Sequence, residues 1–305
     1  MSDIRELQQR IKENPNDYKA IEEYAIALSD IGENEEAYKN FMYLKKVMPE
    51  NPIVYYNLGI ILEKLKDIDG AIQSYQIAFS LDEDNLDIMF NLGNLYIKKN
   101  LLNEAEELFL RLLSEDAEDT NVLFYLGQIY SKKNEHEKSI DFFKKVISLN
   151  FDDTIAKFYL AYEYKRIGDI PLSIQIYEEV IKQAPDYSWA YYNLALIYLE
   201  QNDEERAIFY LERTININSK DVQAIKLAAK IFMKHKKYAA VEKLLKMAVE
   251  EMPLEADLLY LLASLYKELK NKDNYIKLLK LALENSSTFS GNIEKLKAEI
   301  AEIEQ

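Results

Sequence analysis

The sequence predicts an all-α fold, an α-solenoid of antiparallel helix pairs, from three observations. A fixed period, equal to the step from Gly59 to Gly93, runs through most of the 305-residue chain. Apolar residues recur at helical spacing within each period. The chain has seven glycines and six prolines, which is few for its length, so regular structure must run nearly throughout.

Small residues mark the period, because a large side chain where two helices cross would push them apart. One series recurs at this constant step without an insertion: Ala25, Gly59, Gly93, Gly127, Ala161, Ala195, Ala229 and Ala263. A second series is Ala37, Ala71, Ala105, Ser139, Ser173 and Ala207. Val241 and Tyr275 break the second series, which predicts looser or differently angled packing in the last two units.

Eight units follow from this period, and each is predicted to form two helices joined by a short turn. They begin at Tyr18, Pro52, Leu86, Thr120, Thr154, Ser188, Val222 and Ala256, and the last ends at Phe289. Gly32 and Gly168 are expected at the end of a first helix, where a left-handed residue costs glycine least. Pro171 is expected near the start of a second helix, where its missing N–H does little harm.

Both ends of the array carry apolar stripes that predict caps. Residues 1–17 are expected to form a half repeat, with Ile4, Leu7 and Ile11 facing the core. Residues 290–305 are expected to form a capping helix that shields the last apolar face. Its stripe is Ile293, Leu296, Ile300 and Ile303.

The unit pattern is an aromatic residue, Leu-Gly, Tyr, Ala, a further aromatic and Pro at fixed places in each period. On this pattern residues 18–289 resemble the tetratricopeptide repeat family. The resemblance implies a right-handed superhelix that binds proteins without catalysis. It also implies that places 2, 5, 6, 9, 12 and 13, counted from the first residue of each unit, face a concave groove.

The groove places predict an aromatic floor with a basic edge. Place 5 carries Tyr56, Phe90, Phe124, Phe158 and Tyr192, and place 13 carries Lys64, Lys98, Lys132 and Arg166. The amides Asn57, Asn91, Asn94, Gln128 and Asn193 could bond a peptide backbone, and Tyr125, Tyr159, Tyr162 and Trp189 add a central aromatic cluster. Such a groove fits a segment with apolar anchors and acidic residues. The alternative is that these side chains pack between adjacent first helices.

Composition argues against several other classes of protein. The formal net charge of −15 argues against nucleic acid as a partner. No run of 18 apolar residues and no signal peptide is present, so direct membrane insertion is not expected and the cytoplasm is the default compartment. The periplasm is the alternative if a leader has been removed.

No catalytic or metal site is expected either, so the sequence predicts no enzyme activity, no cofactor and no metal. His136 and His235 have no cysteine or second histidine nearby to form a metal site, and no glycine-rich phosphate loop is present. Acidic pairs such as Glu106 and Glu107 are typical of a solvated helix face.

The predicted function is therefore a non-catalytic scaffold that binds a peptide or protein segment in the groove. The alternative is a structural part of a secretion, pilus or motility apparatus that docks through convex faces or solenoid ends. Residues 104–119 have a net charge of −6 and residues 226–246 a net charge of +6. These two runs are either solvated helix faces or a pair of opposite docking patches. Self-association through the ends, the partner and the pathway stay open.

Overall fold

The computed structural model describes residues 4–304. Within that range the chain forms eighteen α-helices and one 3₁₀ helix, and no strand. The cap expected over residues 1–17 and the helix expected over residues 290–305 therefore extend, at their outer ends, beyond the described residues.

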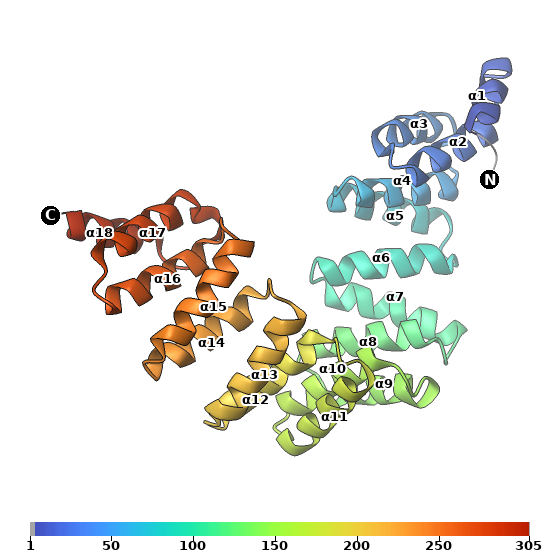
Figure 1. Cartoon of the computed structure of the whole chain (residues 1–305). Coiled ribbons are helices and arrows are strands. Elements are labelled where there is room, and N and C mark those ends of the chain that lie inside the picture. The colour runs from blue at the N-terminus through green and yellow to red at the C-terminus, as the bar shows by residue number, and fades with distance from the viewer. Residues whose placement is uncertain (1–3, 305) are drawn as a thin grey trace. The chain divides into compact units, whose positions relative to one another are not determined.

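The helices alternate between the first and second helix of each repeat (Figure 1). The first helices are α2 (Tyr18–Asp30), α4 (Pro52–Lys64), α6 (Leu86–Lys98), α8 (Thr120–Lys132), α10 (Thr154–Arg166), α12 (Ser188–Glu200), α14 (Val222–Lys234) and α16 (Ala256–Glu268). The second helices are α3 (Asn34–Val47), α5 (Ile68–Leu81), α7 (Leu102–Glu115), α9 (His136–Leu149), α11 (Ile170–Gln183), α13 (Glu204–Ile217), α15 (Tyr238–Glu251) and α17 (Lys272–Glu284). Helix α1 (Ile4–Glu13) precedes them, and η1 (Ser286–Thr288) and α18 (Ile293–Glu304) follow.

The chain divides into two compact units, one up to Phe151 and one from Asp152. Inside each unit a second helix packs between the first helix of its own repeat and the first helix of the next repeat. This alternation buries one apolar face of every helix against neighbours close in sequence. Each unit is thus a stack of helix pairs, an α-solenoid.

The turn inside every repeat contains one residue in the left-handed region at place 15. Gly32 and Gly168 have φ of +89° and +85°, as their position in the sequence predicted. The other six are not glycines: Lys66, Asn100, Asn134, Asn202, Lys236 and Lys270. The N–H of Asp67 donates to the carbonyl of Leu62 over 2.9 Å, so the left-handed residue closes a Schellman motif at the helix end.

The first small-residue series lies against the second helix at place 24. A Cβ built on Gly59 would lie 2.6 Å from the Tyr75 ring, and one on Gly127 would lie 2.7 Å from the Phe143 ring. These distances are shorter than van der Waals contact, so glycine lets the ring approach the helix backbone. The series is therefore a packing requirement.

The second series lies at place 20. Ser139 and Ser173 are fully buried there, and their hydroxyls donate to the carbonyls of Gly127 and Ala161 over 2.8 and 2.7 Å. Serine therefore replaces alanine without leaving a buried hydroxyl unbonded. Val241 and Tyr275, which end the series, are only 0% and 6% exposed, so these larger side chains are also buried at place 20. The expectation of looser or differently angled packing in the last two units stays a prediction.

The two terminal helices cover the ends of the array. Leu7 of α1 is buried, and Ile11 packs against the core of the first unit. In α18, Leu296 and Ile300 are buried and Ile303 packs beside them. Ile293, the first residue of that helix, is 37% exposed and so contributes less to the predicted stripe than its spacing suggested.

Candidate functional site

The aromatic side chains at place 5 rest on their own second helices. The centroid of the Tyr56 ring lies 5.9 Å from that of Tyr75, and Phe90 lies 5.6 Å from Phe109. The same pairing, at 5.6 Å, joins Phe124 to Phe143 and Phe158 to Tyr177. These separations are typical of packed aromatic pairs, so one face of each of these four predicted floor residues is used by the fold.

Side chains at place 6 contact place 5 of the preceding repeat. Tyr125 packs against Phe90 at 5.3 Å between ring centroids. The amide of Asn91 donates to the Tyr56 hydroxyl over 3.1 Å, and that of Asn57 donates to Glu22 over 3.5 Å. For these residues the structure shows packing between adjacent first helices, the alternative that the sequence left open.

Two of the predicted edge cations bond the preceding repeat at place 12. Lys64 donates to the Ser29 hydroxyl over 2.7 Å, and Lys98 lies 3.3 Å from a Glu63 oxygen. Tyr75 donates to the other Glu63 oxygen over 2.9 Å, and burial followed by the Glu63 charge raises the pKa of this tyrosine. Lys98 is therefore one of three side chains that link repeats 2 and 3.

Lys132 differs because place 12 of the preceding repeat is Ile97, which offers no acceptor. Asn94 and Gln128 occupy place 9 of α6 and α8, and Gln128 precedes Lys132 by one helical turn. Within residues 4–304 none of these three side chains has a hydrogen bond or an ion pair. The two amides are half-buried and the lysine is exposed, so these predicted groove positions offer donors that the fold does not use.

An apolar hollow of about 140 Å³ lies on the same face between α2 and α4. Ile26, Phe41, Ile60 and Ile61 form its apolar wall, and Ser29, Asp30, Asn57 and Lys64 complete the lining. Ile26 and Ile60 stand at place 9, the row that continues as Asn94 and Gln128. Sequence reasoning did not include them among the site residues, although their place in the period marked them as groove positions.

The second unit carries the most exposed aromatic residue of the predicted site. Trp189 is 57% exposed and meets Tyr192 edge-on, with ring centroids 6.4 Å apart. Asn193 is buried and its amide donates to the Trp189 carbonyl over 2.8 Å, so this amide serves its own helix. Arg166 lies over the Tyr162 ring at 5.9 Å and bonds its hydroxyl over 3.3 Å.

Phe158 packs within an aromatic group that includes Tyr159, Tyr177 and Tyr187. Tyr177 is fully buried, and its hydroxyl has no hydrogen-bond partner in the described part of the chain. Burial raises the pKa of this tyrosine.

Both charged runs are partly neutralised by ion pairs. Glu106 in the acidic run bonds Lys133 and Tyr130. Although burial would raise the pKa of Glu106, the hydrogen bonds from Lys133 and then Tyr130 lower it. In the basic run Lys226, Lys234 and Lys246 pair with Asp257, Glu204 and Glu242. The net charges of these runs therefore overstate the charge available to a partner.

No group of three or more metal-binding side chains lies within residues 4–304. His235 bonds Glu204, and the pKa of Glu204 is lowered by the hydrogen bond from Lys234 and then by that from His235. Across the same range no helix has the length and hydropathy needed to cross a membrane.

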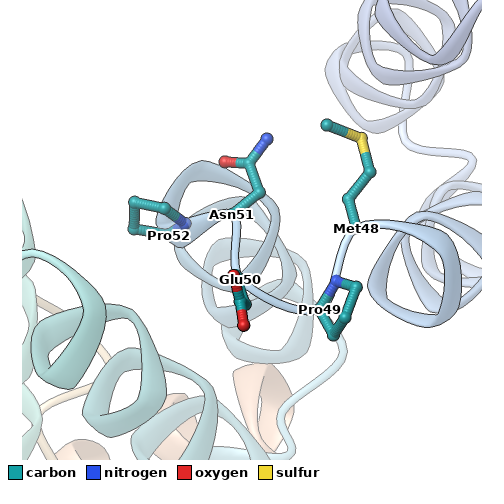
Figure 2. A pocket seen from close by; sticks show the side chains of 5 residues that line it. All are labelled: Met48, Pro49, Glu50, Asn51 and Pro52. Atoms are coloured by element: carbon teal, nitrogen blue, oxygen red, sulfur yellow. The ribbon is translucent and has the colours of Figure 1, made fainter.

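A further hollow of about 530 Å³ lies at the turn between α3 and α4 (Figure 2). It is lined by Met48, Pro49, Glu50, Asn51 and Pro52, whose side chains point in different directions. A ligand site needs polar groups that converge on one volume. This turn does not provide them, so the concave face remains the better candidate.

An α-solenoid of helix pairs with a constant repeat length defines the class of protein, and comparison with known families gives the family. Family models described as tetratricopeptide repeat match residues 16–85, 64–123, 121–153, 168–231 and 256–289. The chain therefore belongs to the tetratricopeptide repeat proteins, which generally mediate protein–protein interactions and are typically non-catalytic scaffolds.

Solved structures support the fold. A tetratricopeptide repeat protein from Parabacteroides merdae is similar, with a TM-score of 0.63 at 19% identity, covering 94% of this chain and 99% of that chain. The C-terminal part of a repeat protein from Cytophaga hutchinsonii has a TM-score of 0.58 at 22% identity, covering 73% and 92%. MamA from Desulfovibrio magneticus has a TM-score of 0.54 at 17% identity, covering 56% and 97%. A search of curated protein sequences finds no match.

Proposed function

We propose that the concave face of the first unit binds a segment of a partner protein. The observation that carries the proposal is the set of unused donors on successive first helices, Asn94, Gln128 and Lys132. Amides suit the backbone of an extended segment, and an unpaired lysine suits a carboxylate. The hollow at Ile26 and Ile60 lies in the same place-9 row and suits an apolar anchor.

The rest of the face supports this proposal by being rigid. Tyr56, Phe90 and Phe124 are held by their second helices, and Lys64 and Lys98 are held by the preceding repeats. A surface whose side chains are already ordered loses less conformational entropy when a segment binds. In this proposal the residues at place 9 and Lys132 provide most of the binding affinity. The packed aromatic residues give the surface its shape.

A peptide-display selection tests the proposal. A random library is selected on the whole protein, and recovered peptides are measured against wild type and the variant Asn94→Ala, Gln128→Ala, Lys132→Ala. We expect recovered peptides to combine an apolar residue with Asp or Glu. Three lost contacts of about 0.5–1.5 kcal/mol each should weaken their binding at least about tenfold.

The matched control removes exposed polar side chains from second helices, Gln73→Ala with Glu107→Ala, and should leave the affinity unchanged. Circular dichroism must show equal helicity for all three proteins. Peptides that bind wild type and the concave variant equally would contradict the proposal.

A further inference from the structure

The linker that follows the last repeat is longer than the linkers between repeats. Residues 82–85 join α5 to α6, and the other repeats are joined by linkers of the same length. Residues 285–292 join α17 to α18, so this linker, the strap, is twice as long. Its last part, residues 289–292, belongs to no helix. The strap therefore has extended chain that contacts earlier helices before α18 begins.

Thr288 in the strap bonds the start of α16. Its Oγ1 accepts a hydrogen bond from the N–H of Ala256 over 2.9 Å and donates to the carbonyl of Leu254 over 3.0 Å. Glu255, which precedes α16, makes no capping bond with its side chain, whereas Asp221 caps α14. The strap thus satisfies a backbone donor at a helix start that lacks a cap of its own.

Ser290 in the strap bonds a buried ion pair. Its N–H donates to one oxygen of Asp257 over 2.8 Å, and its hydroxyl donates to the other oxygen over 2.7 Å. Lys226 pairs with the same carboxylate and donates to the Ser290 hydroxyl over 3.0 Å. Asp257 is buried, and although burial would raise its pKa, the hydrogen bonds from Lys226 and then Ser290 lower it. The strap therefore helps to keep this carboxylate ionised.

Phe289 in the strap packs on Tyr260, with ring centroids 5.3 Å apart. Tyr260 stands at place 5 of repeat 8, in the row of the predicted aromatic floor. In repeat 5 Tyr187 meets the place-5 ring of Phe158 at the same separation. A ring at place 5 therefore accepts an aromatic residue from the linker that follows its repeat.

The side chains that Phe289 and Ser290 contact all stand at predicted groove places. Asp257 occupies place 2 of repeat 8, and Lys226 occupies place 5 of repeat 7. Lys226 replaces the aromatic residue that repeats 2 to 6 carry at place 5. At place 2, three other repeats carry an exposed apolar residue: Ile53, Ile155 and Trp189. The charged pair is thus found at the groove places where the serine of the strap lies.

These contacts have the form of peptide recognition. A carboxylate that receives a backbone N–H and a hydroxyl from one residue fixes the register of an extended chain, and a neighbouring ring contact adds apolar area. Thr288 and Ser290 are nevertheless exposed. A segment on the surface that is held by few contacts opens at a lower free energy than the unit as a whole.

We propose that the predicted groove places of repeats 7 and 8 bind an extended partner segment in which an aromatic residue is followed by serine. The strap occupies this site in the free protein, and the partner segment displaces it. The aromatic residue of the partner then packs on Tyr260, and its serine bonds Asp257 and Lys226. Because the strap competes from within the same chain, it excludes segments that bind weakly.

A peptide with the sequence of the strap tests this proposal in trans. The probe is NSSTFSGN with an N-terminal fluorescein, measured by fluorescence anisotropy on the full chain. Wild type should bind it weakly, because its own strap fills the site. The strap variant Phe289→Ala, Ser290→Ala should bind it at least about tenfold more tightly. The peptide NSSTAAGN, which lacks both contacts, should bind neither protein.

A matched control changes the strap where it makes no contact of this kind. Ser286 and Ser287 have no side-chain hydrogen bond in the described part of the chain. Ser286→Ala with Ser287→Ala should therefore bind the probe as weakly as wild type does. Circular dichroism and thermal melts must show that the strap variant stays folded. Ser290→Ala alone repeats the test with a smaller gain if the double variant melts early.

A third substitution locates the bound peptide. Asp257→Asn, added to the strap variant, should weaken binding of the probe at least about tenfold, because a charged acceptor of two hydrogen bonds becomes a neutral amide. The first-unit variant Asn94→Ala, Gln128→Ala, Lys132→Ala should bind the probe as wild type does, so the two proposals are tested separately.

Equal binding of the probe by wild type and a folded strap variant would overturn the proposal. So would no detectable binding by the strap variant, which is the result expected of a linker that only caps the last repeat. Binding that Asp257→Asn leaves unchanged would also overturn it, since the peptide would then lie elsewhere.

Discussion

Three repeats of the first unit and three of the second build the contact between first and second helix in two different ways. In the first unit, repeats 2 to 4 pair a glycine at place 8 with an aromatic ring at place 24: Gly59 with Tyr75, Gly93 with Phe109 and Gly127 with Phe143. In the second unit, repeats 6 to 8 pair an alanine with a leucine: Ala195 with Leu211, Ala229 with Leu245 and Ala263 with Leu279. The volume across the crossing is shared between two residues and stays similar.

The two solutions differ in energy terms. Glycine inside a helix costs about 1 kcal/mol relative to alanine. The rings at place 24 offset this because they also contact the rings at place 5, as Phe109 does with Phe90 at 5.6 Å. A leucine at place 24 loses the contact with the ring at place 5. The alanine that accompanies it at place 8 is a better helix former than glycine. Repeats 1 and 5 pair an alanine with a ring, Ala25 with Phe41 and Ala161 with Tyr177, so a ring at place 24 is compatible with either small residue at place 8.

The largest expected effect comes from mixing the two solutions. Phe143→Leu in the first unit should lower the free energy of unfolding by about 2 kcal/mol, because a cavity remains beside Gly127. Adding Gly127→Ala should recover about 1 kcal/mol through helix propensity and partial filling. Chemical denaturation followed by circular dichroism measures both.

The reverse exchange is the control. Leu245→Phe alone should destabilise by about 1–3 kcal/mol through overpacking against Ala229, and Ala229→Gly should relieve part of that loss. If the paired substitutions gave simple sums of the single effects, the coupling between places 8 and 24 would be disproved.

A second test compares two buried tyrosines at place 24. Tyr75 bonds Glu63, whereas place 12 of repeat 5 is Lys165, which pairs with Glu200 over 2.8 Å. Tyr75→Phe should therefore destabilise by about 1 kcal/mol. Tyr177→Phe should be neutral or slightly stabilising, because that hydroxyl has no partner in the described chain. Equal losses in denaturation would show that Tyr177 has an acceptor in solution.

A third test uses the left-handed turns. Lysine at positive φ is strained, so Lys66→Gly, Lys236→Gly and Lys270→Gly should each raise the free energy of unfolding by about 0.5–1 kcal/mol. One of these turns lies in the first unit and two lie in the second. The triple variant should therefore stabilise the second unit more than the first. Thermal melts of single variants measure the gain, and Lys237→Gly, one residue later, should show none.

The smallest expected effect concerns the end of the second unit. Glu299 of α18 accepts hydrogen bonds from Lys267, Tyr275 and Tyr260. Burial would raise the pKa of Glu299, but the bonds from Lys267 and then Tyr275 lower it below 4.5. This contribution to stability is present above pH 4.5 and is lost as the pH falls through the lowered value.

The protection of α18 amides against hydrogen exchange, relative to the intrinsic rate at each pH, should therefore fall in acid before that of α1 does. In the Glu299→Gln variant the amides of α18 should exchange fast already at neutral pH, and their protection should no longer depend on pH in this way. Identical profiles for wild type and the variant would show that Glu299 does not hold α18.

The period made much of the fold predictable. The first helices begin at the residues that the small-residue spacing gave, from Tyr18 to Ala256, because a constant period without insertions leaves no freedom in phase. The turns at Gly32 and Gly168 were predictable because glycine adopts positive φ more readily than other residues. The six turns at lysine and asparagine could be found only by extending the period, since their side chains do not require positive φ.

The candidate site was less predictable, because its free groups depend on neighbours in the preceding repeat. Lys64, Lys98 and Lys132 stand at the same place, yet only Lys132 follows an isoleucine at place 12 of the preceding repeat. A concave position could be assigned from the period. Whether its side chain was already bonded could not, because that depends on distances and rotamers.

Trp189 has a consequence for how occupancy of the second unit can be observed. It is the only tryptophan of the chain, stands at a predicted groove position and is 57% exposed. Its fluorescence therefore comes from one known location and should resemble that of solvated indole. A segment that covers this position should shift the emission to shorter wavelength and protect it from iodide quenching, whereas a ligand that binds only to second helices should leave the spectrum unchanged. The protein thus carries an optical probe that separates these two cases without a label.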